Sequence, residues 1–205
     1  MMTDDLTVPR TLRAVGIAGS LRAGSYNQLL LDNVIRLSPD ELEIEPFTRL
    51  AEIPPFNEDD ARQGGPAVVV ELRDAVRAAD ALIIATPEYN YGVPGVLKNA
   101  LDWISIPPGN SGLEGKVVAL MGASPSILGT ARAQSQLRQS FVFTQSHVVN
   151  HPEVFVTKAH TRFENGTLTD PGATKLIGQL LNNTVKLVRT LRSADGNAPV
   201  PGAVR

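Results

Sequence analysis

A short segment rich in glycine and hydroxyl side chains has the chemistry of an anion-binding loop. Gly19 to Asn27, which includes Tyr26, follows an apolar run and leads into a helical pattern. Glycines let backbone N–H groups approach an anion closely, and the start of a helix favours negative charge. Four of its side chains can donate hydrogen bonds, namely those of Ser20, Arg22, Ser25 and Asn27. Since no acidic residue lies between Leu12 and Leu31, the segment predicts a phosphate site.

Two known nucleotide-binding motifs do not fit this segment. Gly19 and Gly24 have the spacing of a P-loop, but Ser25 stands where that loop carries its lysine. The buried-looking run Ala81 to Thr86 also lacks the Mg²⁺-binding aspartate of P-loop NTPases. The pair Gly16 and Gly19 does not complete the G-x-G-x-x-G dinucleotide fingerprint. A monophosphate fits better than a pyrophosphate, and the alternative is a solvated turn with an exposed arginine.

A second polar loop follows the run 81–86 and reads Pro87-Glu88-Tyr89-Asn90-Tyr91. Prolines and glycines fix an irregular, rigid backbone here. The tyrosines offer flat amphipathic faces, and backbone amides around Asn90 can bond heteroatoms at the edge of a ring. A planar, heteroatom-rich ring beside a phosphate site describes FMN. Considered alone, the tyrosines are better explained as loop packing residues, but beside the phosphate site the flavin interpretation is favoured.

A third polar loop nearly matches the nucleophile elbow of α/β-hydrolases. It reads Gly122-Ala123-Ser124-Pro125-Ser126, and Glu153 and His160 follow in suitable order. Pro125, however, has no N–H for an oxyanion hole, and Ser126 replaces the required glycine. These two residues exclude the hydrolase. Ser124 can instead hydrogen-bond the pyrimidine edge of a flavin, and a turn or cap role is the open alternative.

Composition narrows the class of protein further. The chain has 205 residues, 42% of them hydrophobic, with a net charge of −2 and no cysteine. These values predict one globular domain, exclude disulfides and thiol catalysis, and provide no basic surface for nucleic acid or acidic membranes. His147 and His151 have a helical metal-ligand spacing, but their surroundings predict a strand and turn, so no metal is expected. Without a signal-like start or a membrane-length apolar run, a cytoplasmic protein is expected.

Strand-like runs alternate with helical patterns, which predicts an α/β, flavodoxin-like three-layer sandwich with a five-stranded parallel sheet of order 2-1-3-4-5. The expected strands are Leu12 to Gly19, Glu41 to Phe47, Ala81 to Thr86, Lys116 to Gly122 and Ser146 to Val149. The expected helices are Tyr26 to Leu37, Ala67 to Ala79, Gly95 to Ile104, Thr130 to Ser140 and Thr174 to Leu191. In this topology the ligand crevice lies beyond strands 1 and 3, where the first two polar loops occur.

The chain reads as a single FMN-binding domain over residues 1–205, with flexible tails at about 1–11 and 193–205. The segment from Leu50 to Pro66 is too long for a simple connection. It is expected either to cover a site or to form a plain surface excursion.

Two motifs together resemble those of the NADPH-dependent FMN reductase family, in particular the branch with bacterial quinone and chromate reductases. The motifs read Gly19-Ser20-Leu21-Arg22-x-x-Ser25-x-Asn27 and Pro87-Glu88-Tyr89-Asn90-Tyr91-x-x-Pro94-Gly95-x-Leu97-Lys98-Asn99-Ala100-x-Asp102-Trp103. The resemblance covers about residues 12 to 192. It departs from the family pattern at Gly92, where relatives often carry serine, and at Pro125, Ser126 and Thr130, where members usually carry glycine.

The resemblance implies bound FMN and a homodimer or homotetramer. The phosphate of FMN would be held by Ser20, Arg22, Ser25 and Asn27, with Tyr26 in the same segment. Its ring would be framed by Pro87, Glu88, Tyr89 and Asn90, with Ser124 near the pyrimidine side.

The reaction implied by the resemblance is ping-pong. NADPH or NADH reduces the flavin, and a quinone, free flavin or similar small oxidant then takes the electrons. The cofactor carries this chemistry, so no side chain is assigned a catalytic role. One alternative is a flavodoxin-type electron-transfer protein acting on a redox partner, which the nearly neutral charge disfavours. Another is a non-catalytic nucleotide-binding module.

Overall fold

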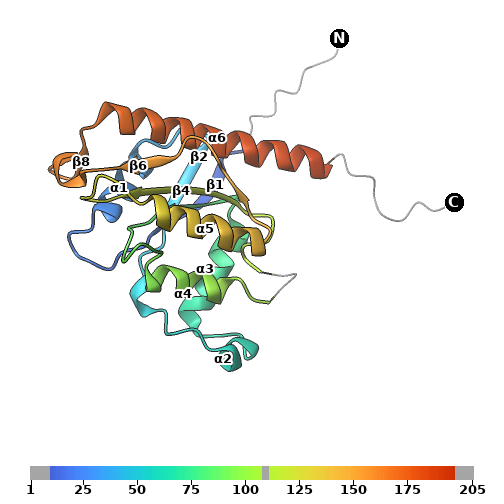
Figure 1. Cartoon of the computed structure of the whole chain (residues 1–205). Coiled ribbons are helices and arrows are strands. Elements are labelled where there is room, and N and C mark those ends of the chain that lie inside the picture. Colours follow the sequence, from blue (N-terminus) through green and yellow to red (C-terminus); the bar gives the residue numbers. More distant parts are fainter. Residues whose placement is uncertain (1–9, 108–110, 197–205) are drawn as a thin grey trace, which may run out of the picture.

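A parallel β-sheet forms the middle layer of the fold, and helices cover both of its faces (Figure 1). The computed structural model describes residues 10–107 and 111–196. The main strands follow the order β2-β1-β3-β4-β5, which confirms the predicted flavodoxin-like topology. Their bounds are β1 (Leu12–Ala18), β2 (Leu42–Pro46), β3 (Ala81–Ala85), β4 (Val117–Ala123) and β5 (His147–Val148).

The central strand β3 shows how the sequence builds two cores. Its five residues are all fully buried, and successive side chains of a strand point to opposite faces of the sheet. Ala81, Ile83 and Ala85 therefore join the core on one face. Leu82 and Ile84 join the core on the other. A continuous apolar run of this kind is typical of a parallel strand covered on both sides.

The predicted helices are all present and divide between the two faces. One core lies under α1 (Tyr26–Arg36) and α6 (Pro171–Gly196). The other lies under α3 (Ala67–Ala78), α4 (Gly95–Ile104) and α5 (Ala131–Phe143). Figure 1 shows α6 along one side of the sheet, opposite α3, α4 and α5.

The C-terminal helix is longer than predicted. α6 starts at Pro171 instead of Thr174 and continues to Gly196, so the first residues of the expected C-terminal tail are helical. Two ion pairs hold its last turns to the body of the protein: Arg189 with Glu41 at 3.0 Å, and Arg192 with Asp80. The other residues of the two expected tails lie outside the described residues, except for 10 and 11.

The edge of the sheet is split between two short strands. β5 pairs with the beginning of β4, at Val117 and Val118. A further strand, β6 (Val154–Val156), pairs with the end of β4, from Met121 to Ala123. The sequence predicts only the first of these strands, because three apolar residues after a proline carry little periodicity.

The long segment after β2 contains a 3-10 turn, η1 (Leu50–Glu52), and a short helix, α2 (Glu58–Arg62). It is held against α4, where the Trp103 indole N–H and the Asn99 amide both donate to the carbonyl of Pro54 at 2.8 Å. Before α6 lie a second 3-10 turn, η2 (Ala159–Thr161), and a hairpin of β7 (Phe163–Glu164) and β8 (Thr167–Leu168).

Candidate functional site

A cleft of about 290 Å³ lies beyond the carboxyl ends of β1, β3 and β4. It brings together the three polar loops that the sequence singles out. Nine of the ten predicted site residues line it, the exception being Asn90. The nine are Ser20, Arg22, Ser25, Tyr26, Asn27, Pro87, Glu88, Tyr89 and Ser124.

The first loop presents several donors that the fold does not use. The backbone N–H groups of Leu21, Ala23 and Gly24 have no acceptor within the described residues. Ser25, only 3% exposed, caps α1, since its Oγ accepts from the N–H groups of Asn27 and Gln28. Its hydroxyl proton has no acceptor among the described residues and can therefore bond a ligand. Unused amides and hydroxyls at a helix start fit a phosphate group.

Asn27 lies deeper than a simple phosphate donor would. It is 2% exposed, its amide nitrogen donates to the carbonyl of Ala123 at 2.9 Å, and its Oδ1 accepts from the N–H of Ala123 at 2.8 Å. These two bonds tie the start of α1 to the end of β4. The side chain therefore holds the first and third loops together, and its predicted donation to phosphate stays a prediction.

Arg22 carries a positive charge that no carboxylate in the described part of the chain neutralises. Its guanidinium lies over the ring of Tyr26, with its central carbon 5.5 Å from the ring centroid. A charge held in place but not paired is suited to an anionic ligand.

A direct contact joins the first and second loops. The hydroxyls of Ser20 and Tyr89 are 2.9 Å apart. Because both residues line the cleft, a group bound near the Ser20 hydroxyl also lies near that of Tyr89.

The second loop is a tight hairpin turn. Tyr89 and Gly92 exchange both backbone hydrogen bonds, at 3.1 and 3.0 Å. Between them, Asn90 and Tyr91 have φ angles of 49° and 68°, as a type I′ turn requires. Asparagine tolerates this left-handed conformation, whereas tyrosine adopts it at some cost. Asn90 is exposed and does not line the cleft, so its predicted place beside the ring stays a prediction.

The Glu88 carboxylate faces a helix rather than an empty site. Only 10% of its side chain is exposed. It accepts from the backbone N–H groups of Arg132 at 2.9 Å and Ala133 at 3.2 Å, and from the Arg132 guanidinium at 3.0 Å. A carboxylate at the start of α5 is stabilised by the free N–H groups and the helix dipole. The side chain of Glu88 therefore anchors the second loop to α5.

Sequence reasoning missed Arg132 as the partner of Glu88. The central guanidinium carbon of Arg132 also lies 3.8 Å from the ring centroid of Tyr91, so one side chain contacts both the residue before the turn and a central residue of the turn. No signal in the sequence points to this pairing, because a threonine before a helix normally caps it. Only the structure shows that the side chain of Thr130, which precedes α5, makes no cap hydrogen bond. A helix start without its own cap needs an acceptor from elsewhere.

Ser124 fulfils the turn role that the sequence left open. Its Oγ accepts from the N–H of Ser126 at 3.1 Å, while its own N–H donates to Val156 in β6 at 3.0 Å. The strand β6 therefore fixes the third loop in position. The hydroxyl proton of Ser124 is still available to a ligand in the cleft, so both interpretations remain compatible.

Gly122 is required by the close approach of two loops. A Cβ atom at this position would lie 2.0 Å from Thr130 Oγ1 and 2.3 Å from the carbonyl oxygen of Thr86. No side chain fits in this space. The glycine thus lets Thr86, after β3, and Thr130, before α5, pack closely against β4.

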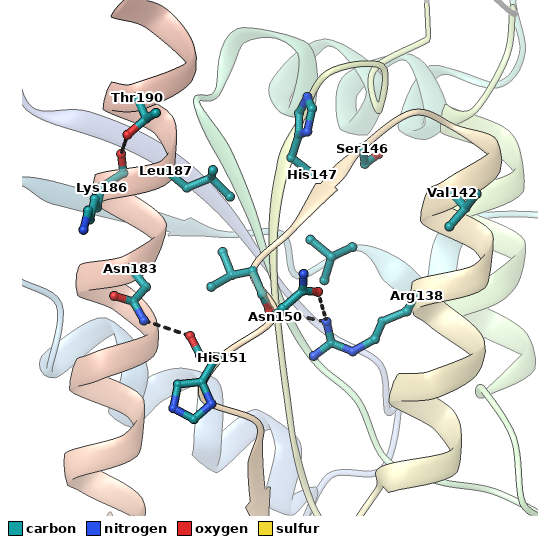
Figure 2. Close-up of a pocket in the computed structure, with 12 residues that line it drawn as sticks. Arg138, Val142, Ser146, His147, Asn150, His151, Asn183, Lys186, Leu187 and Thr190 are labelled. Carbon is teal, nitrogen blue, oxygen red and sulfur yellow. Dashed lines mark hydrogen bonds between the residues drawn. The ribbon is translucent and has the colours of Figure 1, made fainter.

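A second cavity, of about 660 Å³, lies between α5 and α6 at the β5 edge (Figure 2). Arg138 donates to Asn150 Oδ1 at 3.1 Å, and Asn183 donates to the carbonyl of His151 at 2.8 Å. These bonds hold the chain between β5 and β6 from both sides. The rings of His147 and His151 point away from one another in Figure 2. The polar groups of this second cavity thus hold the segment between β5 and β6 in place. Its lining residues include no glycine-rich loop like that of the first cleft.

Two further properties concern all of the residues that the structure describes. No group of side chains suited to holding a metal ion occurs within residues 10–107 and 111–196. None of the helices described there is long and apolar enough to cross a membrane.

Comparisons with known proteins agree with this geometry. The family model for NADPH-dependent FMN reductase matches residues 12–161. The chain is 46% identical over 192 residues to an NAD(P)H-dependent FMN reductase of Pseudomonas aeruginosa, covering 93% of this chain and 100% of that protein. It is 39% identical over 173 residues to a quinone reductase of Escherichia coli strain K12, covering 82% and 92%. Among solved structures, FerB, a flavoenzyme NAD(P)H:(acceptor) oxidoreductase from Paracoccus denitrificans, matches with a TM-score of 0.78 at 29% identity, covering 87% and 98%.

Proposed function

We propose that this chain, which belongs to the NADPH-dependent FMN reductase family, binds FMN and uses NADPH or NADH to reduce small oxidants. Quinones and free flavin are the proposed acceptors, and the names of relatives that are quinone reductases support this class. The observation that carries the proposal is the meeting of an anion-binding loop and a tyrosine-bearing loop in one cleft.

The residues present suit each part of FMN. The unused N–H groups of the first loop, the Ser20 and Ser25 hydroxyls and the unpaired charge of Arg22 would hold the phosphate. Tyr89 and the backbone of the second loop would frame the ring, and the hydroxyl of Ser124 would donate to its edge. Bound FMN supplies the hydride and electron chemistry.

The protein's own contribution is therefore positioning. Glu88 and Arg132 fix the second loop against α5, and Asn27 fixes the first loop against the third. Preorganised donors require no rearrangement when charge develops on a ligand, which is why such rigid loops stabilise a reduced anionic cofactor. No side chain of the cleft is proposed as a proton donor or nucleophile.

A visible absorption spectrum of the purified protein, followed by anaerobic addition of NADPH or NADH, tests the proposal. We expect a yellow protein whose flavin absorbance bleaches, and steady NAD(P)H oxidation with a quinone and no added protein. Bleaching without turnover would instead indicate an electron carrier for a redox partner. A colourless protein that cannot be loaded with FMN would refute the proposal.

The phosphate role of Arg22 has its own test. Arg22→Ala should weaken FMN binding by about 30- to 100-fold, because loss of a charge-assisted hydrogen bond should cost about 2 to 2.7 kcal/mol. The dissociation constant is measured by quenching of flavin fluorescence. Unchanged affinity would show that the guanidinium does not contact the phosphate.

We also propose that the protein is a homodimer or homotetramer. Val142 and Phe143, at the end of α5, are 78% and 82% exposed, and two neighbouring large apolar side chains in water favour a protein contact. Light scattering of the wild type and of Phe143→Ser tests this assignment. A monomeric wild type would contradict it.

The cytoplasm is the proposed location, because a soluble NAD(P)H-dependent reductase depends on the cell's pool of reduced nicotinamide cofactor. Fractionation of cells that express a tagged chain would test this. Recovery of the protein outside the cytoplasmic fraction would overturn it.

A further inference from the structure

Arg22 is packed on two sides by its own loop. Its guanidinium lies 5.5 Å from the ring centroid of Tyr26, within the range of a cation–π interaction. A Cβ atom on Gly24 would lie only 3.2 Å from Arg22 Nη1. An arginine on an exposed loop is otherwise free to adopt many rotamers, so the ring of Tyr26 selects where its charge lies.

Tyr26 is in turn supported by a residue more than 130 positions away. Its ring stacks on that of Phe163, with centroids 6.1 Å apart and an angle of 24° between the planes. Both rings are partly buried against the core under α1 and α6. Arg22, Tyr26 and Phe163 thus form a continuous stack from the mouth of the cleft to the hairpin of β7 and β8.

The hairpin that carries Phe163 is fixed to α1. The Asn33 side chain donates to the carbonyl of Gly166 at 2.8 Å and accepts from the N–H of Leu168 at 2.9 Å. Arg36 donates to the same carbonyl at 3.0 Å. Since Tyr26 is the first residue of α1 and Asn33 lies two turns later, one helix carries Tyr26 and also holds the hairpin that carries Phe163.

We propose that Phe163 is a positioning residue for the cofactor phosphate, acting on Arg22 through Tyr26. The inference rests on the proposed function, because it requires that Arg22 bind the phosphate of FMN. It assigns a role in cofactor binding to the β7–β8 hairpin, which lies outside the cleft. Phe163 itself touches no ligand in this scheme.

Riboflavin, which has the ring of FMN but no phosphate, makes the test specific. In the full-length apoprotein, Phe163→Leu should raise the dissociation constant of FMN about threefold and Tyr26→Leu about fivefold, since one cation–π contact is lost or loosened. The riboflavin constant should change by less than about twofold. Tyr26→Phe, which keeps the ring, should restore FMN binding to nearly the wild-type value. Circular dichroism confirms that each variant folds.

A double-mutant cycle shows whether the effect passes through the arginine. In an Arg22→Ala background, Phe163→Leu should have no further effect on FMN affinity. Phe47→Leu is the matched control, because Phe47 is a partly buried aromatic residue packed against the other core, and it should leave both constants unchanged.

Two results would overturn the inference. One is an equal loss of FMN and riboflavin affinity in Phe163→Leu, which would indicate general loosening of the site. The other is an undiminished effect of Phe163→Leu without Arg22. A wild-type protein that binds neither flavin would refute the proposed function instead, so the two failures are distinguishable.

Discussion

Removing the Glu88 carboxylate should loosen the second loop from α5 and destabilise the whole protein. The carboxylate accepts from two backbone N–H groups of α5 and from the Arg132 guanidinium. Loss of a helix cap costs about 1 kcal/mol, and loss of the charge at the helix start costs about 0.5–1 kcal/mol more. The ion pair adds little, because 37% of the Arg132 side chain is exposed. We therefore expect Glu88→Ala to lower the free energy of unfolding by about 2 kcal/mol.

Urea unfolding followed by circular dichroism measures this loss directly. In a chain of this length the corresponding fall in Tm is about 4–8 °C. Glu88→Gln keeps an oxygen acceptor but removes the charge, so it should lose about half as much stability. Glu43→Ala is the control, because Glu43 is exposed on β2 and forms no ion pair within the described residues. Its effect should stay below about 0.5 kcal/mol.

Flavin binding separates an anchoring role from direct contact. Because the carboxylate faces α5, Glu88→Gln should change the FMN dissociation constant by no more than about threefold, or 0.7 kcal/mol. A fully stable Glu88→Gln variant that has lost FMN would refute this reasoning and assign the carboxylate to the ligand.

Three further predictions concern the packing of the loops and a buried charge. Gly122→Ala should lower the free energy of unfolding, measured in urea, by about 3 kcal/mol or more. Adding Thr130→Ala should not restore this stability, since the backbone oxygen of Thr86 would still lie 2.3 Å from the new Cβ. Asn27→Ala should lower the free energy of unfolding by about 2 kcal/mol, because it leaves the buried N–H and C=O of Ala123 without partners; an unchanged unfolding midpoint would contradict this. Burial lowers the pKa of Lys116 below the ordinary lysine value, so the charged ammonium opposes folding. The free energy of unfolding should therefore rise as pH increases from that lowered pKa toward the ordinary lysine pKa. Lys116→Met should abolish this rise in urea unfolding measured across that pH range.

Much of this fold follows from local sequence patterns. The apolar runs of β3 and β4, that of β1, which only Arg13 interrupts, and the amphipathic helices between them give strong signals, and the rule of right-handed crossovers leaves few ways to connect these elements. The first two polar loops follow β1 and β3, so their meeting in one cleft follows from the topology. The residues that line the cleft could therefore be predicted before their geometry was known.

The remaining features depend on contacts between residues far apart in the chain. Glu88 and Arg132 are 44 positions apart, and Asn27 and Ala123 are 96 apart. A single sequence shows which side chains are polar, but not which of them the fold uses to hold itself together. The strand β6 was missed for a related reason, because its pairing with β4 determines it more than its own three residues do. The start of α6 was misplaced although it has a local signal: Asp170 Oδ1 accepts from the N–H groups of Gly172 and Ala173, and Pro171 opens the helix.

The divided margin of the sheet has a consequence for solubility. A long, straight outer strand offers unpaired backbone groups on which another chain can add, which is a common origin of aggregation. Here β5 has two residues and β6 has three, with a proline-containing bend between them. Neither piece is long enough to template a foreign strand. Straightening this bend, for example by deleting residues 150–152, should therefore make the protein prone to aggregation even if its cofactor cleft stays intact.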